Sequence, residues 1–480
     1  MNYKAISYVL GKIFMVLGAL LFLPLCVSIY YAENQLFSFL IPSLLLIFTG
    51  FILTVKKPKN LSIYTKEGLV ICGLSWIFIS AAGALPFVIS KTIPNFISAF
   101  FETCSGFTTT GATVLTQIEG LPKSILFWRA FTHWIGGMGI LLFMMAIIPK
   151  SESHSMFIMK AEVPGPKAGK VVSKIQESAR ILYIIYIAIT LLEIVMLTIF
   201  TDMRFFDAVT TTFSTAGTGG FANLNDSILG YNSPAAEWII SVFMFLFAAN
   251  FNLYFFLLIK KFSSAFKNEE LWIYIGINIS AVVMITCDLM QSYSSFSEAL
   301  RNAVFNVNSI MSTTGFCTVD YNKWSSFSKT ILMILMFVGG CAGSTGGGLK
   351  VSRVLIYVKE VFAELRKSIK PRSIVKIKMN GRPVEKEVIT GINAYLVIYC
   401  LILVVSVFLV SINGFDMETS FSAVVACFNN VGPGLSAVGP TGNYADFSIF
   451  SKVVLCIDML AGRLEIFPIL ILFNPATYKK

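Results

Sequence analysis

Apolar residues run almost unbroken over lengths close to the roughly 20 residues that an α-helix needs to cross a bilayer. Ten such stretches occur, at residues 8–30, 36–55, 68–90, 124–148, 181–200, 236–259, 271–290, 329–349, 388–412 and 452–473. They predict ten membrane spans and an all-α polytopic membrane protein. Lys12 lies inside the first stretch and no small-residue cleavage site follows, so we expect this stretch to be retained rather than removed as a secretory signal.

A second pattern lies between the spans and occurs four times. After the third, fifth, seventh and ninth spans comes an apolar segment too short to cross, which we call a half-helix: residues 95–107, 204–214, 297–312 and 417–429. Each half-helix ends in a glycine-bearing tail, and another span follows. The tails are Thr109-Thr110-Gly111-Ala112 (tail 1), Gly217-Thr218-Gly219-Gly220 (tail 2), Thr313-Thr314-Gly315-Phe316 (tail 3) and Asn430-Val431-Gly432-Pro433 (tail 4).

The unit of span, half-helix, tail and span therefore follows an extra leading pair of spans. We place this pair at residues 1–66 and the four pore units at 67–150, 151–268, 269–386 and 387–480. One Thr-Gly turn would be an ordinary loop, but four at matching places in the topology indicate a common purpose.

That purpose fits a cation filter. A potassium ion gives up its hydration water only where carbonyl oxygens replace it, and glycine lets a chain aim successive carbonyls at one axis. Half-helices would also point their partially negative C-terminal ends toward the pore centre, which favours a cation. Four tails in one chain can close a ring, so the pattern predicts a pseudo-fourfold pore within one subunit.

A different glycine cluster interrupts the eighth span. Six glycines fall within residues 339–350, which we call the glycine loop. Irregular backbone at membrane depth is tolerated only where it is buried in protein or lines a cavity, so the loop indicates a pore or substrate path. Close packing of helices through small residues is the alternative. A nucleotide-binding P-loop is excluded, because Leu349 precedes Lys350 and Val351 stands where Ser or Thr is needed.

Composition and charge agree with a membrane setting. Hydrophobic residues make up 56% of the chain and charged residues 13%, although the net charge is +11. The basic residues gather in alternate loops, around Lys56, Lys150 to Lys174, Lys260 and, most densely, Lys350 to Lys386. By the positive-inside rule these loops and both termini are cytoplasmic, whereas the opposite loops lean acidic. All nine cysteines lie in or beside apolar segments without a CxxC pair, which predicts free thiols.

With these features the chain resembles the Trk/Ktr/HKT superfamily of cation transporters, and its leading pair makes it most similar to the bacterial TrkH/TrkG pore-forming subunits. Besides the tails, the resemblance depends on Trp134-Ile-Gly-Gly-Met-Gly139, Ala342-Gly-Ser-Thr-Gly-Gly-Gly348 and Gly462-Arg-Leu-Glu465. It implies potassium-binding filter residues Thr109, Thr110, Gly111, Gly217, Thr218, Gly219, Thr313, Thr314, Gly315, Asn430, Val431 and Gly432. It also implies a gate at Gly343, Ser344, Thr345, Gly346, Gly347, Gly348 and Arg463.

Further expectations come from the same resemblance. They are regulated, channel-like potassium uptake across the bacterial cytoplasmic (inner) membrane and a homodimer. The expected regulator is a TrkA-like cytosolic protein that binds NAD or ATP/ADP; membrane lipids are the other partner of the basic loops. A symporter coupled to protons or sodium stays open as the alternative. With two histidines and no metal-ligand spacing, neither an enzyme, a cofactor other than potassium in the filter, nor a nucleic-acid partner is expected.

Three polar residues inside spans invite interpretation. Arg463 lies midway along an apolar run, where a charge costs at least roughly 2.5–3.5 kcal/mol unless it faces water or a partner. It is expected to face the pore, and the resemblance implies a place near the glycine loop. A structural ion pair with Asp458 or Glu465 is the alternative, and the two are compatible. Arg129 and His133 lie four residues apart on one helix face and are expected to brace the first filter loop rather than to relay protons. The glycine loop is expected to move easily, because few side-chain contacts would hold it.

Overall fold

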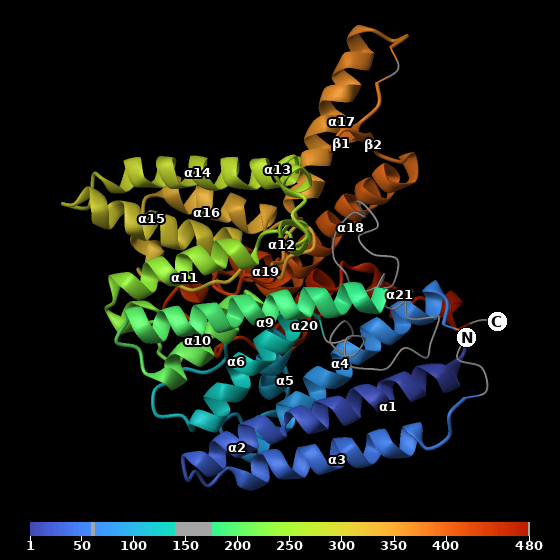
Figure 1. The fold of residues 1–480 in the computed structure, drawn as a ribbon. Coiled ribbons are helices and arrows are strands. Elements are labelled where there is room, and N and C mark those ends of the chain that lie inside the picture. The colour runs from blue at the N-terminus through green and yellow to red at the C-terminus, as the bar shows by residue number, and fades with distance from the viewer. Residues whose placement is uncertain (59–62, 140–174, 374, 479–480) are drawn as a thin grey trace.

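The computed structural model describes residues 1–58, 63–139, 175–373 and 375–478. Almost all regular structure in this part of the chain is helical (Figure 1), which confirms the all-α polytopic fold. The exception is a hairpin in the basic linker. Its strands β1 (Lys378–Met379) and β2 (Arg382–Pro383) pair antiparallel across Asn380 and Gly381, both of which have positive φ.

The leading pair packs through small residues. It consists of α1 (Tyr3–Leu20), α2 (Phe22–Tyr30) and α3 (Leu36–Thr54). Ser43 Oγ in α3 donates a 2.6 Å hydrogen bond to the Gly18 carbonyl in α1, and a Cβ on Gly11 would meet the carbonyl oxygen of Gly50 at 3.0 Å. Small residues at such a contact let two membrane helices approach closely. The pair borders one side of the molecule, away from α14 and α16 (Figure 1).

The remaining helices follow the order of the four predicted units. The first unit has α4 (Thr65–Ile89), α5 (Phe96–Phe107) and α6 (Lys123–Gly137); the second α9 (Ile175–Phe200), α10 (Phe205–Gly217), α11 (Pro234–Phe247) and α12 (Phe251–Leu258); the third α14 (Glu269–Leu289), α15 (Phe296–Met311), α16 (Ser326–Val338) and α17 (Val351–Ile369); the fourth α18 (Lys386–Ser411), α19 (Met417–Phe428), α20 (Ile449–Arg463) and α21 (Phe467–Phe473). Short helices lie between them, namely α13 (Phe262–Phe266), η1 (Leu229–Tyr231), η2 (Tyr321–Lys323) and η3 (Ser436–Val438), and η4 (Pro475–Thr477) follows the last of them.

Long apolar helices make this a multi-pass membrane protein. Within the described residues, six helices are long and apolar enough to cross a bilayer, and a seventh crossing results if the bent pair α11 and α12 is counted. Large apolar side chains on them remain exposed, such as Phe48 in α3 and Phe408 in α18 at 65% and 68%. A soluble protein would not expose such faces, so they are suited to lipid.

The second spans of the second, third and fourth units are not continuous. The glycine loop confirms the predicted break of the eighth span, whereas the breaks in the sixth and tenth predicted spans are corrections. In the second unit α11 and α12 meet at an 88° bend, where Asn250 caps α12 by accepting from the Asn252 N–H. In the fourth unit Glu465 and Ile466 have φ of 57° and 67°, which ends α20. In the third unit the glycine loop separates α16 from α17. The part of the fourth predicted span beyond residue 139, and the basic loop from Lys150 to Lys174, lie outside the described residues.

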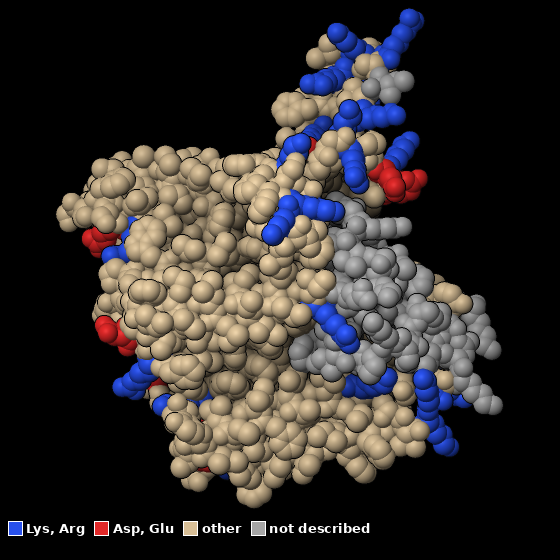
Figure 2. Space-filling view, in the orientation of Figure 1, with Lys and Arg blue, Asp and Glu red and all other residues tan. Residues whose placement is uncertain are grey.

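Helix α17 projects from the body of the molecule, with the β-hairpin beside it (Figure 1). Lys and Arg side chains gather on this projection in the space-filling view (Figure 2). One face of α17 is apolar and exposed, with Phe362 and Ile369 at 61% and 77%. The projection thus combines a basic surface with an apolar helix face.

Candidate functional site

The four half-helices α5, α10, α15 and α19 end in the same hydrogen-bonded cap. After each helix, one backbone N–H donates a 2.8 Å hydrogen bond to the carbonyl five residues earlier in the chain: Thr110 to Ser105, Gly219 to Ser214, Thr314 to Ser309 and Val431 to Ala426. The preceding N–H reaches three residues back in every case. This pair of bonds defines the Schellman motif. Four different sequences therefore give one backbone geometry.

The cap sets the equivalent positions of the tails. Its left-handed residues are Thr109, Thr218, Thr313 and Asn430, with φ between 54° and 61°. Two residues later each tail has a glycine of positive φ: Gly111 (84°), Gly220 (81°), Gly315 (84°) and Gly432 (95°). Tail 2 was therefore misaligned by one residue in the sequence-based prediction. Gly220, not Gly219, corresponds to Gly111, and Gly217 occupies the place of Thr108, Ser312 and Asn429.

These four glycines link the tails into a closed ring. A Cβ on Gly111 would collide with the Gly219 carbonyl oxygen, one on Gly220 with that of Thr314, and one on Gly315 with that of Val431. A Cβ on Gly432 would meet the carbonyl oxygen of Thr110, which returns to tail 1. Each contact joins a glycine to the carbonyl of the next tail in chain order. The arrangement brings together the predicted residues of all four tails, with Gly220 in addition.

The other glycines of tail 2 make room for His133 of α6. A Cβ on Gly219 would strike the His133 ring, and one on Gly217 would strike the His133 carbonyl. His133 Nδ1 lies 2.7 Å from the carbonyl oxygen of Gly106, and its Nε2 accepts a 3.2 Å bond from the Phe221 N–H. Because a carbonyl can only accept, Nδ1 carries the proton and the ring is neutral. His133 thus ties the end of α5 to the segment after tail 2.

A buried ion pair between Arg129 and Glu102 holds the same region together with His133. Arg129 Nε lies 2.9 Å from Glu102 Oε1, and the two side chains are only 2% and 0% exposed. The remaining groups are also paired: Glu102 accepts from the Val114 N–H at 2.9 Å, and Arg129 donates to the Ala222 carbonyl at 3.2 Å. The expected bracing by Arg129 and His133 is present, and Glu102 is a partner that sequence reasoning missed. We call Glu102, Arg129 and His133 the side-chain brace.

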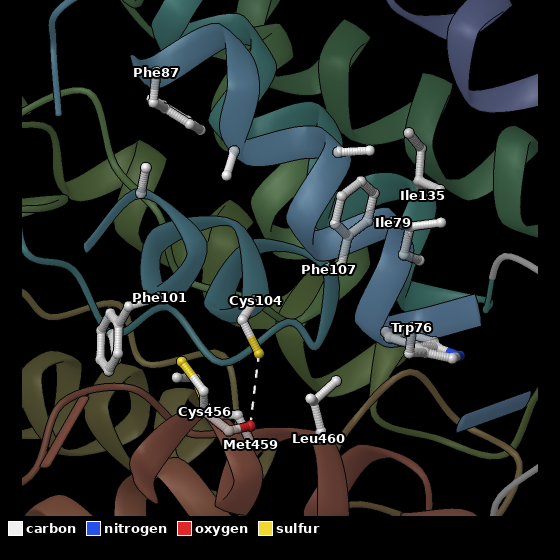
Figure 3. Close-up of a cluster of buried hydrophobic side chains, with 14 of the residues drawn as sticks. Trp76, Ile79, Phe87, Phe101, Cys104, Phe107, Ile135, Cys456, Met459 and Leu460 are labelled. Atoms are coloured by element: carbon white, nitrogen blue, oxygen red, sulfur yellow. Dashed lines mark hydrogen bonds between the residues drawn. The ribbon is translucent and has the colours of Figure 1, made fainter. Parts of the chain in front are cut away.

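Apolar packing fixes the first half-helix from its other sides (Figure 3). Phe101, Cys104 and Phe107 of α5 are fully buried between Trp76 and Ile79 of α4 and Met459 of α20. Cys104 Sγ also lies 3.6 Å from the Cys456 carbonyl oxygen. All nine cysteines are free, as predicted.

The glycine loop lies against the ring and is held by hydrogen bonds to several elements. At the break between α11 and α12, the Cys341 N–H donates to Ala248 O at 2.9 Å and the Phe251 N–H to Gly343 O at 3.0 Å. The Thr345 hydroxyl donates to Phe247 O at 3.1 Å. The expectation that few side-chain contacts hold this loop is wrong, because the side chains of Thr345, Thr313 and Arg463 all form hydrogen bonds with its surroundings or its backbone. Sequence reasoning failed here because these partners come from distant parts of the chain.

Two glycines of the loop fit between the ends of α15 and α19. A Cβ on Gly346 would lie 2.8 Å from Ser312 O, and one on Gly347 would collide with Asn429 O. The Gly347 N–H donates a 2.6 Å hydrogen bond to the hydroxyl of Thr313 in tail 3. Close approach, and not only conformational freedom, thus requires glycine at these positions.

Two cationic side chains hold the loop. Arg463 donates to Thr345 O at 2.6 Å, and to Gly136 O and Gly137 O at 2.6 and 2.5 Å at the end of α6. Lys350, only 2% exposed, donates from Nζ to Gly346 O. Arg463 therefore bridges the first, third and fourth units. Lys350 was not predicted as a site residue, although its place right after the glycines was the available signal.

Carboxylates complete the charge balance around the loop. Glu270 accepts from the N–H groups of Ala342 and Ser352, at 2.7 and 3.1 Å, and so joins both ends of the loop. Glu465 pairs with Arg353 at 2.5 Å, and Asp458 accepts from Ser406 at 2.7 Å. Within the described residues neither of these two acids forms an ion pair with Arg463, so that alternative is not what the structure adopts.

A cavity of about 600 Å³ lies beyond tail 3, between the end of α14 and the start of α16. Asp226, Asp288 and Asp320 line it. Asp288 accepts from Ser328 Oγ at 2.6 Å, so this carboxylate also anchors the first turn of α16. In the part of the chain that the structure describes, no group of three His, Cys, Asp or Glu side chains could hold a metal ion.

Comparisons with known proteins agree over the whole chain. The profile of the TrkH family, described as cation transport proteins, matches residues 37–478. The chain is 34% identical to the Trk system potassium uptake protein TrkH of Salmonella typhimurium over 100% of both chains, and 29% identical to TrkG of Escherichia coli over 98% of both. The crystal structure of the potassium transporter TrkH from Vibrio parahaemolyticus superimposes with a TM-score of 0.89 at 32% identity, covering both chains completely.

Proposed function

The chain belongs to the TrkH family of cation transport proteins, and we propose on this basis that it takes up potassium through a gated, channel-like pore. The selectivity filter of this proposal is the ring of four tails, with Gly220 in place of Gly217. One observation supports it above the others: each tail's positive-φ glycine contacts the next tail's carbonyl, so the four segments surround one axis. Carbonyl rings of this kind replace the hydration shell of potassium.

The proposed gate is the glycine loop with Arg463 and Lys350. The loop occupies the space between the C-terminal ends of α15 and α19, where helix dipoles would otherwise favour a cation. Two positive side chains bound to its carbonyls oppose a cation in the same place. Opening then requires the loop to leave these partners.

The alternative of a symporter coupled to protons or sodium has less support. A proton relay through the membrane needs titratable groups in line, and His133 holds its ring nitrogens against the backbone of Gly106 and Phe221. Fixed in this way, it serves packing and not transfer. The relatives are named as potassium uptake proteins, which also speaks against an enzyme.

Regulation and assembly are the finer parts of the proposal. The relatives are components of a Trk system, which fits a partner protein. We place a TrkA-like cytosolic regulator, binding NAD or ATP/ADP, against the basic projection of α17 and the β-hairpin, and a second copy of the chain in a homodimer. The protein would lie in the bacterial inner membrane with both termini cytoplasmic. The basic loops support this orientation.

Purified protein in planar bilayers tests the function. The current should reverse at the potassium equilibrium potential when potassium gradients are imposed, whatever the pH and the sodium concentration. A reversal potential that follows the proton or sodium gradient would establish coupled transport instead. A second experiment neutralises the charges of Arg366, Lys367, Lys370 and Arg372. If the regulator still co-purifies with this variant, the basic projection contacts lipid and not the regulator.

A further inference from the structure

The left-handed residues of the four tails are held in different ways. Thr218 Oγ1 donates to the adjacent Gly217 carbonyl at 2.6 Å, and Asn430 Nδ2 donates to Thr110 Oγ1 and to Met459 O, both at 3.0 Å. Thr109 Oγ1 has no hydrogen-bond partner in the described part of the chain. Thr313 Oγ1 accepts from Gly347 of the glycine loop. In tail 3, therefore, the partner belongs to the segment that we propose as the gate.

This difference matters because the left-handed conformation is unfavourable for threonine. A β-branched residue at φ of 61° is strained and persists only where its surroundings hold it. At Thr313 one of the groups that hold it leaves if the loop moves. The Gly347 N–H, buried between α15 and α19, would likewise lose its acceptor.

We propose that Thr313 is a positioning residue that couples the glycine loop to the filter. Its hydroxyl stabilises the closed loop, and the closed loop stabilises tail 3. Withdrawal of the loop releases tail 3 alone among the four tails, so open probability and ion selectivity change together. This proposal rests on the proposed potassium pore and adds that gate and filter are not independent.

The test uses Thr313→Val, which keeps the β-branched shape but removes the acceptor. Single-channel recordings without regulator should give an open probability about two- to tenfold higher than that of the wild type, the range expected for one buried hydrogen bond. Thr313→Ser keeps the hydroxyl, so its open probability should be closer to that of the wild type than to that of Thr313→Val. Thr109→Val is the matched variant at the equivalent position of tail 1. A change in its conductance would not bear on the proposal, but its effect on open probability should be clearly smaller than that of Thr313→Val.

A second measurement does not depend on transport. Hydrogen–deuterium exchange of the peptide covering Gly343 to Leu349 should be faster in Thr313→Val than in Thr109→Val or the wild type, because the Gly347 amide has lost its acceptor. Equal exchange and equal open probability in all three proteins, with potassium-selective current intact, would overturn the coupling alone. Loss of potassium selectivity in the wild-type protein itself would instead overturn the proposed function.

Discussion

Two opposite sides of the ring of tails are built differently. Between tails 1 and 2 lies the side-chain brace, in which a buried ion pair and a neutral histidine join α5, α6 and the segment after tail 2. Between the ends of α15 and α19 lies the glycine loop, a stretch of backbone held by hydrogen bonds. The brace cannot leave without stranding charge in the interior. The proposed gating requires the loop, in contrast, to exchange its hydrogen-bond partners, including Lys350 and Arg463. Under the proposed function, one side of the ring is therefore permanent and the other removable.

The largest effect is expected from breaking the brace. Arg129→Met leaves Glu102 buried without its cation, which typically costs ~3–5 kcal/mol. We expect a much lower melting temperature and little folded protein by size-exclusion chromatography in detergent. The double variant Arg129→Met with Glu102→Gln removes both charges and should recover part of the loss. A single variant as stable as the wild type would show that the pair does not hold the two tails together.

The next effect tests the corrected register of tail 2. In Gly220→Ala the new Cβ would collide with Thr314 O, and a left-handed alanine costs roughly 1–2 kcal/mol. The permeability ratio of potassium to sodium should fall about tenfold, since ~1.4 kcal/mol corresponds to that factor. Gly217→Ala should reduce folded yield instead, because its Cβ would strike His133 O.

Gly276→Ala provides the control for this series. Gly276 lies in α14 with nothing within 4 Å of a new Cβ, so this variant should be as stable as the wild type or slightly more stable. If Gly217→Ala changed selectivity while Gly220→Ala did not, the original alignment of tail 2 would be right.

Sequence reasoning placed the four half-helices but not the exact register of the tails that follow them. Periodic apolar runs and the caps of half-helices are local features, so α5, α10, α15 and α19 were placed within a few residues. Tail 2 has three glycines, and more than one alignment puts a glycine over Gly111. Only the Schellman bonds decide between the alignments, because they fix Thr218 as the left-handed residue.

Long-range partners were the second limit. Arg129 and His133 were recognised as a brace from their spacing on one helix face, but Glu102 lies on another helix, 27 positions earlier. Sequence reasoning also missed the direct hydrogen bond between the glycine loop and tail 3, in which Gly347 donates to Thr313. Contacts of this kind arise from the fold and have no sequence pattern of their own.

The third prediction tests how removable the loop is. Arg463→Gln withdraws a charged donor from Thr345, Gly136 and Gly137 carbonyls, and hydrogen bonds to charged groups contribute roughly 1.5–3 kcal/mol each. Glutamine can restore only part of this, so basal potassium flux into liposomes without regulator should rise about tenfold or more. A fall in flux from folded protein would mean that Arg463 supports the pore rather than closes it.

The smallest effect concerns Lys350, which holds the same loop by one contact to Gly346 O. Lys350→Met keeps the length of the side chain and removes the donor and its charge. We expect basal flux to rise less than in Arg463→Gln, because one charged hydrogen bond is lost instead of three and Arg463 still holds Thr345. Lys350→Arg keeps the charge and should stay closer to the wild type. In the double variant Lys350→Met with Arg463→Gln, the increase in basal flux should equal the product of the two single increases if the two cations act separately. An increase smaller than that product would show that both residues release one concerted movement of the loop.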